Sequence, residues 1–149
     1  MRFHLIDRVD AFEAGKSISA RKLTSHSEEF WEHAGGALRM PPPFVLEALC
    51  QAGTWLIMIT TERRQRAALL SVGRVEWHGP VHPGDVLEMT CAVDAWGSET
   101  AVISGRVTVD GRTVLEASEI MCALLDAETL ADLKDTERLQ QVLTRMEAV

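Results

Sequence analysis

The sequence predicts an α+β domain in which an antiparallel β-sheet wraps around one long central helix. The segment 43–66 is helix-prone and apolar nearly all round, so neighbouring elements must bury it on several sides. Segments with strand-like alternation follow it between residues 67 and 125, and a hairpin precedes it. A sheet that curls around one helix buries such a helix on most of its surface.

Composition narrows the class of protein. A chain of 149 residues is long enough for one domain with a sizeable core. Its net charge of −7 argues against a nucleic-acid partner, because binding phosphates needs a basic face. Cys50, Cys91 and Cys122 form no CxxC pair, which favours reduced thiols in a cytoplasmic protein. The apolar stretch 44–59 is short for a bilayer span and carries Glu47, so no membrane insertion is expected.

The first half of the chain contains three predicted elements. A hairpin is expected at 5–25, where two strand-like runs flank a short turn. Residues 27–34 predict a short helix, with Ser27 as N-cap and acidic residues in the first turn. The long helix at 43–66 follows, and Pro43 is tolerated in its first turn because that N–H would lack an intrahelical partner.

The second half predicts the remaining sheet. A turn-rich segment at 79–85 has two prolines and two glycines, and His78 and His82 beside these prolines are expected on surface loops. The hairpin signal Asp110-Gly111 joins the last two strands. The domain is expected to span 1–125, and 126–149 to form a polar helical tail. The predicted strands are 67–78, 86–96, 100–109 and 112–125.

Two residues near the start of the long helix are candidates for acid–base chemistry. His33 lies in a glycine-rich loop, and histidine is well suited to accept a proton near neutral pH. Glu47 lies within an apolar stretch, where a carboxylate is costly to bury unless it is paired or protonated. Gln51 is one turn later on the same face and can orient it. The plainer alternatives are an ordinary loop histidine and a partly exposed glutamate at an interface.

The region 31–53 resembles the β-hydroxyacyl-acyl-carrier-protein dehydratases, a family with the hotdog fold. Their motif runs roughly H-F-P-G-x-P-x-M-P-G and is followed by a helix beginning L-x-x-E-A-x-x-Q. His33, Gly36 and Met40-Pro41 match the motif, and Glu47 and Gln51 match the helix. The resemblance covers about residues 3–125, because further stretches agree in order: LIDRV, GRVEWHGPVHPGDVLEM and GRTVLEASEIMCAL.

The resemblance implies dehydration of a 3-hydroxyacyl thioester, bound to an acyl carrier protein or coenzyme A, in fatty acid or polyketide-like biosynthesis. His33 would remove the α-proton, and Glu47 of the partner subunit would protonate the leaving hydroxyl. Gly36 would shape the loop, and Gln51 and Phe44 would support substrate binding. It also implies a homodimer or higher homo-oligomer, with the acyl chain in an apolar tunnel beside the helix. No cofactor or metal site is expected.

Two departures from the family motif bear on this expectation. Ala34-Gly35 replaces Phe-Pro, and Pro42 replaces a glycine whose N–H, by the resemblance, binds the thioester carbonyl. Proline has no N–H, and losing one such donor typically costs about 10²- to 10³-fold in rate. The N–H of Phe44 is one possible substitute. Two alternatives stay open: a hotdog acyl thioesterase, and a catalytically degenerate subunit that binds acyl chains or pairs with an active homologue.

Arginines gather near the predicted end of the long helix, at Arg63, Arg64 and Arg66. Such a cluster commonly marks a solvated helix end, where cations suit the negative pole of the helix dipole. Because acyl carrier proteins are acidic, the same cluster is a candidate docking site for one.

Overall fold

The computed structural model describes residues 3–129 and 132–145. Its secondary structure follows the predicted order, with a second, small hairpin before the long helix. The elements are β1 (Arg8–Glu13), β2 (Ser17–Leu23), β3 (Glu32–Ala34), β4 (Ala37–Arg39), α1 (Pro42–Thr60), β5 (Gln65–Trp77), β6 (Val86–Trp96), β7 (Thr100–Val109), β8 (Arg112–Asp126), a 3₁₀ turn (Ala127–Thr129) and α2 (Leu133–Thr144).

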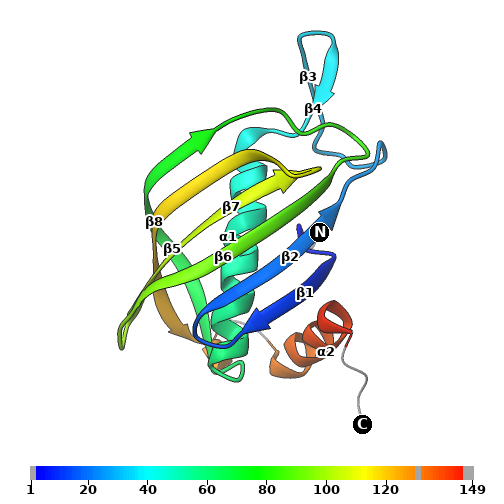
Figure 1. Ribbon diagram of the computed structural model, residues 1–149. Helices are drawn as coiled ribbons and strands as arrows, with labels where there is room; N and C mark the ends of the chain where they lie inside the picture. The colour runs from blue at the N-terminus through cyan, green and yellow to red at the C-terminus, as the bar shows by residue number, and fades with distance from the viewer. Residues whose placement is uncertain (1–2, 130–131, 146–149) are drawn as a thin grey trace.

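Six strands form one antiparallel sheet in the order β1-β2-β6-β7-β8-β5, and the sheet wraps around α1 (Figure 1). This arrangement confirms the predicted class. Strands β3 and β4 pair only with each other, and their hairpin projects beyond the main sheet near the start of α1. The free edges of the main sheet belong to β1 and β5, which each have one partner strand in the described chain.

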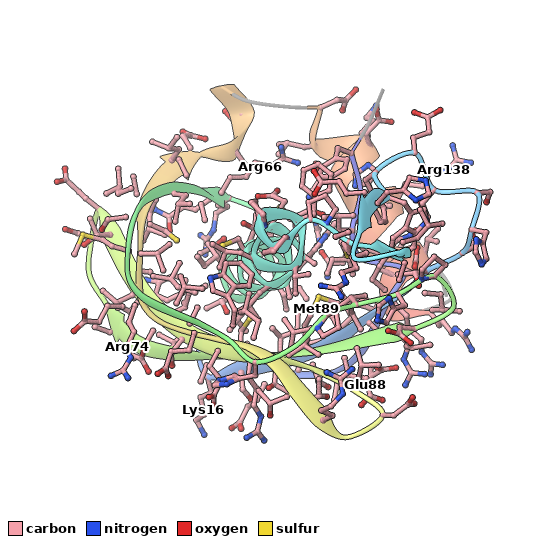
Figure 2. All side chains as sticks on the ribbon, turned by 90° about the horizontal axis from the view of Figure 1, so that it is seen from above. Lys16, Arg66, Arg74, Glu88, Met89 and Arg138 are labelled. Atoms are coloured by element: carbon pink, nitrogen blue, oxygen red, sulfur yellow. The ribbon has the colours of Figure 1, made fainter. Side chains whose placement is uncertain are left out.

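The side chains of the strands point alternately toward α1 and toward solvent, and β-bulges let the sheet curve around the helix. Glu88 points to solvent and its neighbour Met89 points toward α1, as the view along the helix shows (Figure 2). Extra residues interrupt the ladders between Leu69 and Ser71, between Val93 and Ala95, and between Ile103 and Gly105. Each bulge increases the local twist and bends its strand, which lets a flat ladder close around a helix.

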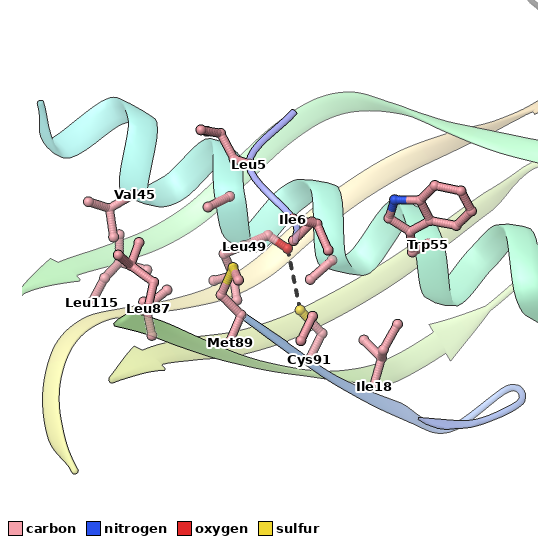
Figure 3. Close-up of a cluster of buried hydrophobic side chains, with 14 of the residues drawn as sticks. Leu5, Ile6, Ile18, Val45, Leu49, Trp55, Leu87, Met89, Cys91 and Leu115 are labelled. Atoms are coloured by element: carbon pink, nitrogen blue, oxygen red, sulfur yellow. Dashed lines mark hydrogen bonds between the residues drawn. The ribbon is translucent and has the colours of Figure 1, made fainter. Parts of the chain in front are cut away.

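Helix α1 is the centre of the core. By length and composition alone its 19 residues are sufficient to cross a membrane, although the sequence predicted too short an apolar stretch. Instead, the sheet buries it: Leu49, Leu56 and Ile57 are fully covered, and Leu49 packs among Leu5, Met89 and side chains of neighbouring strands (Figure 3). This apolar helix is therefore the core helix of the domain.

The helix predicted at 27–34 is wrong. Ser27 lies in a turn, and residues 32–34 form strand β3. Phe30 and Trp31 are adjacent in sequence, so a helix would point them in different directions. In the observed turn their rings lie 5.0 Å apart, and Phe30 also packs against Phe44 at 5.8 Å. Aromatic packing onto the start of α1 therefore outweighs the local helix signal.

Helix α1 ends six residues earlier than predicted. Its last residue is Thr60, and Glu62 and Arg63 adopt positive φ values of 52° and 66°, which reverse the chain. Arg64 follows in the turn and Arg66 lies in β5, so the helix has no basic residue in its last turn. Arg64 still meets the negative pole of the helix, because its Nε donates to the carbonyl of the C-cap Thr61 at 3.1 Å, whereas the side chains of Arg63 and Arg66 contact α2.

Gly105 is required where β7 lies close to its neighbours. A Cβ there would lie 2.4 Å from the carbonyl oxygen of Thr90 and 2.9 Å from Leu49. We expect Gly105→Ala to lower the free energy of unfolding by about 1–3 kcal/mol, because a backbone atom has to move. Urea denaturation measures this loss.

Gly53→Ala is the matched control for that variant. Its added methyl meets only the flexible end of Ile103, and alanine favours a helix by about 1 kcal/mol over glycine. It should therefore cost less than Gly105→Ala. Equal losses for the two variants would contradict the argument.

The C-terminal tail contains α2, which packs beside β1 (Figure 1). Asp132 caps it, because its side chain accepts a hydrogen bond from the N–H of Lys134 at 2.9 Å. Leu143 is buried in the main core. The tail therefore adds a cover to the domain, although residues 130–131 and 146–149 of the predicted tail lie outside the described residues.

Candidate active site

His33 lies in the middle of β3 and is exposed to solvent. Its direct cross-strand partner is Leu38 of β4. The turn between the strands is Gly35-Gly36, with φ values of 60° and 81°. This pair suits a two-residue hairpin, and proline cannot adopt the positive φ at position 35. Glycine at position 35, where the family has proline, therefore allows this tight turn. His33 lies two residues before the turn.

Glu47 lies in the second turn of α1 and is half-buried. Gln51 donates to Glu47 Oε1 through Nε2 at 2.9 Å. The same amide accepts from the N–H of Leu5 at 2.8 Å and donates to the carbonyl of Phe3 at 3.1 Å. Gln51 thus holds one carboxylate oxygen of Glu47 and ties it to the N-terminal segment. The second oxygen stays available for a proton.

The start of α1 has no free backbone donor in its first turn. Pro41 is the N-cap, and Pro42 and Pro43 occupy the first two helical positions. The N–H of Phe44 donates to the carbonyl of Pro41 at 2.9 Å. The predicted substitute donor is therefore already engaged within the helix.

A cavity of about 530 Å³ opens beside the start of α1. Its lining includes Phe3, Phe30 and Phe44, and the ring of Phe44 packs edge-on against Phe3 at 5.1 Å. Phe44 lies one turn before Glu47 on the same stripe of the helix. A larger groove of about 870 Å³ covers the outer face of the sheet, but no predicted site residue lines it. The smaller cavity is therefore the better candidate for an apolar chain.

His33 and Glu47, the predicted acid–base pair, do not contact each other within one chain. Within residues 3–129 and 132–145, no hydrogen bond or ion pair connects His33 with Glu47. The hairpin extends away from the helix start (Figure 1), whereas the carboxylate of Glu47 is bonded to Gln51, which in turn binds the N-terminal segment. The expectation that a partner subunit contributes one of the two residues is consistent with this separation.

The predicted docking arginines differ in their surroundings. Arg63 contacts Gln140 at 3.2 Å and Glu137 at 3.4 Å, both on α2. Arg66 donates to Thr136 of α2 at 3.2 Å (Figure 2 labels Arg66). Arg64 donates to the carbonyl of Thr61. The tail helix thus engages two of the three side chains, and docking of a carrier protein on them stays a prediction.

The cysteines do not supply a thiolate. Burial raises the pKa of Cys50, three residues after Glu47, to about 12, with a smaller contribution from the charge of Glu47. Burial likewise raises the pKa of Cys91 to about 12. Both thiols are therefore neutral at physiological pH, and a nucleophilic cysteine is not part of this site.

In the described part of the chain, one group of side chains has ligand atoms close enough to hold a metal ion. These atoms, on Glu76, His78 and Glu116, lie within 4.8 Å of one another. Arg74 pairs with Glu76 at 2.7 Å, and Arg106 is the cross-strand partner of Glu116. Arg74 balances Glu76, and His78 Nε2 lies 3.0 Å from Glu116 Oε2, so pairing among these side chains explains the cluster. It lies on the outer face of the sheet, and within the described residues no hydrogen bond or ion pair connects it to His33 or Glu47.

Gln51→Met tests the connection between Gln51 and the N-terminal segment. Methionine keeps the volume but leaves the buried Leu5 N–H without an acceptor. We expect the free energy of unfolding to fall by about 1–3 kcal/mol, because an unmet buried donor has that cost. Urea denaturation measures the change. Gln141→Met on α2 is the control and should have little effect; equal losses would contradict the role of Gln51.

The fold and this geometry define a hotdog-fold protein with a histidine on a hairpin and an oriented glutamate on the central helix. The model of the FabA-like domain matches residues 1–118, so α2 lies outside the match. The chain belongs to this FabA-like domain family.

Relatives support the assignment. The chain is 35% identical to the 3-hydroxyacyl-[acyl-carrier-protein] dehydratase FabZ of a Nitratiruptor species, over 83% of this chain and 88% of the relative. It is 36% identical to FabZ of Nitrosospira multiformis, over 84% of this chain and 88% of that protein.

Solved structures agree on the fold. Smu.793 from Streptococcus mutans UA159, bound to acetyl CoA, has a TM-score of 0.67 at 16% identity over 85% of this chain and 94% of that one. The dehydratase heterocomplex ApeI:P from Xenorhabdus doucetiae has a TM-score of 0.64 at 16% identity over 92% of this chain and 89% of its own.

His82 makes a contact near the candidate site that the sequence does not predict. The sequence predicts a surface loop, but His82 is half-buried, and its Nδ1 lies 2.8 Å from the carbonyl of Leu38. A lone histidine in a proline turn gives no signal of such a contact, because it joins segments 44 residues apart.

Proposed function

We propose that this protein is a cytoplasmic dehydratase of 3-hydroxyacyl thioesters carried on an acyl carrier protein or coenzyme A. The reaction yields a trans-2-enoyl thioester and water and belongs to fatty acid or polyketide-like biosynthesis. The observation that carries the proposal is Glu47, held by Gln51 on the central helix of a chain related to FabZ dehydratases at 31–36% identity.

The residues fit the two proton transfers. His33 has no hydrogen-bond partner for its ring nitrogens within the described chain, so either nitrogen is free to accept the α-proton. Glu47 gives a proton to the β-hydroxyl, which leaves as water while the double bond forms. Afterwards the proton on His33 returns to Glu47 through water. General acid and base groups of this kind each contribute about 10²- to 10⁴-fold.

The proposed enzyme is a homodimer whose sites combine His33 of one subunit with Glu47 of the other. Two features support this. First, the pair is not joined within one chain. Second, among the described strands the 13-residue β5 pairs with β8 alone, and it exposes Leu69 and Leu70. Long exposed edges recruit further strands, and a two-fold axis beside β5 and perpendicular to the sheet would pair β5 antiparallel with its copy and extend the sheet into the second subunit.

The reaction is tested with two carrier-bound substrates. A 3-hydroxyacyl thioester should gain the absorbance of the conjugated enoyl product, and a saturated acyl thioester should remain intact. Release of free thiol from the saturated substrate, without enoyl product, would support the thioesterase alternative instead. Coenzyme A thioesters of the same acyl groups then show which carrier is preferred.

A second candidate is a subunit that pairs with a different, active hotdog chain. The run Pro41–Pro43 and the engaged N–H of Phe44 favour it, because the helix start lacks a donor for the substrate carbonyl. The ApeI:P neighbour is itself described as a dehydratase heterocomplex. In such a pair, this chain would supply His33 to the partner's helix. Activity that appears only after mixing with a FabZ-type chain of the same organism would support this candidate.

A further inference from the structure

The hairpin that carries His33 has few connections to the rest of the domain. Its strands β3 and β4 are three residues each and stand apart from the main sheet. In the described chain, two hydrogen bonds hold it: the N–H of Met40 donates to the carbonyl of Val81 at 2.9 Å, and His82 Nδ1 contacts the carbonyl of Leu38. The first lies just beyond β4, so the second is the one that reaches the hairpin itself.

The direction of the His82 contact is fixed by its chemistry. A carbonyl oxygen only accepts hydrogen bonds, so Nδ1 must carry a hydrogen and donate it. The donor persists whether the ring is neutral or protonated.

The carbonyl that His82 holds belongs to the residue opposite His33. Leu38 and His33 are direct cross-strand partners in the β3–β4 ladder. The position of the Leu38 backbone therefore determines where the His33 backbone lies, and with it the direction of the His33 side chain. No other side chain in the described residues donates to this hairpin from the main domain.

His82 itself is rigidly placed. Its N–H donates to the carboxylate of Asp85 at 2.8 Å, which closes the turn. The buried hydroxyl of Thr24, just after β2, donates to the carbonyl of Asp85 at 2.7 Å. A continuous set of hydrogen bonds thus runs from the main sheet through this turn to the hairpin.

We propose that His82 is a positioning residue for His33, acting through the carbonyl of Leu38. The expected effect of His82 on the reaction rate rests on the proposed function, but its expected effect on the position of the hairpin does not. His82 takes over the anchoring that the glycine turn, without Phe-Pro, does not provide. Misplacing a reacting group by about 1 Å costs on the order of 10²-fold in rate.

Three variants of His82 test the proposal. His82→Ala removes the donor. His82→Asn places an amide nitrogen near the former Nδ1, whereas His82→Gln places it farther out, near the former Nε2. With the 3-hydroxyacyl substrate, we expect kcat to fall about 10- to 100-fold in His82→Ala, with KM little changed. His82→Asn should recover most of the rate and His82→Gln should not. His78→Ala, in the same segment but paired with Glu116, is the control and should behave as the wild type.

A readout independent of activity follows the hairpin directly. Trypsin cleavage after Arg39 requires the hairpin to open, because Arg39 is exposed but Met40 is buried. Mass spectrometry should find faster cleavage there in His82→Ala and a near-normal rate in His82→Asn. Unchanged cleavage and kcat in His82→Ala, or no recovery in His82→Asn, would overturn the proposal. If His82→Ala is cleaved faster but the wild type is inactive, the anchoring of the hairpin by His82 is supported and the dehydratase function is rejected.

Discussion

Two inactive variants, His33→Ala and Glu47→Gln, should regain activity when they are mixed. Each alone should lose about 10²- to 10⁴-fold in kcat, because each removes one proton-transfer group. In a homodimer with shared sites, a mixed dimer has one site with both substitutions and one site with neither. Random exchange makes about half of the dimers mixed, so about a quarter of the wild-type sites return.

The measurement is the rate of enoyl formation after the two variants are unfolded and refolded together. Each variant refolded alone is the control, and gel filtration confirms that both still form dimers. Recovery to about a quarter would place the two groups on different subunits. No recovery, with mixed dimers demonstrated, would contradict the shared site and favour a pair within one chain.

Pro42→Gly should increase the rate of the enzyme. The substitution restores an N–H at the first position of α1, where Pro41, Pro42 and Pro43 offer none and Phe44 is engaged. Because one such donor is worth about 10²- to 10³-fold in other enzymes, a gain in kcat of at least about tenfold is expected. Stability should fall by about 0.5–1 kcal/mol, since glycine is freer than proline in the unfolded chain.

Pro43→Ala is the matched control for Pro42→Gly. It also converts one proline of the run into a residue with an N–H, but one position farther along the helix. Its kcat should change much less. If neither variant is faster than the wild type, the helix start is not where the thioester carbonyl binds. Equal gains in both would show that the effect belongs to the helix start as a whole rather than to position 42.

Much of the fold could be predicted because periodicity and turn chemistry are local signals. The apolar segment at α1 and the alternation in β6 and β7 identify the helix and the strands. The two failures have different causes. Ring packing decides the stretch around Phe30 and Trp31. The end of α1 at Thr60 follows from the positive φ of Glu62 and Arg63, which their residue types do not signal.

The sequence proposes the residues of the candidate site, whose roles stay a prediction, but it does not indicate most of their hydrogen bonds. The motif spacing identifies His33, Glu47 and Gln51, and the hydrogen bond from Gln51 to Glu47 follows from their positions one helical turn apart. The bonds from Gln51 to Phe3 and Leu5, and from His82 to Leu38, join segments more than 40 residues apart. Such contacts depend on how the elements pack and leave no mark in the spacing of a single sequence.

The hydrogen bonds of Gln51 to the N-terminal segment bear on the order in which activity and folded structure are lost under denaturing conditions. The segment at Phe3 and Leu5 precedes the edge strand β1, and sheet edges open at lower free energies than central strands. Each local opening releases Gln51 and with it the orientation of Glu47. We therefore expect the proposed dehydratase activity to be lost at milder conditions than those that unfold the sheet around α1, because this edge of the domain opens first.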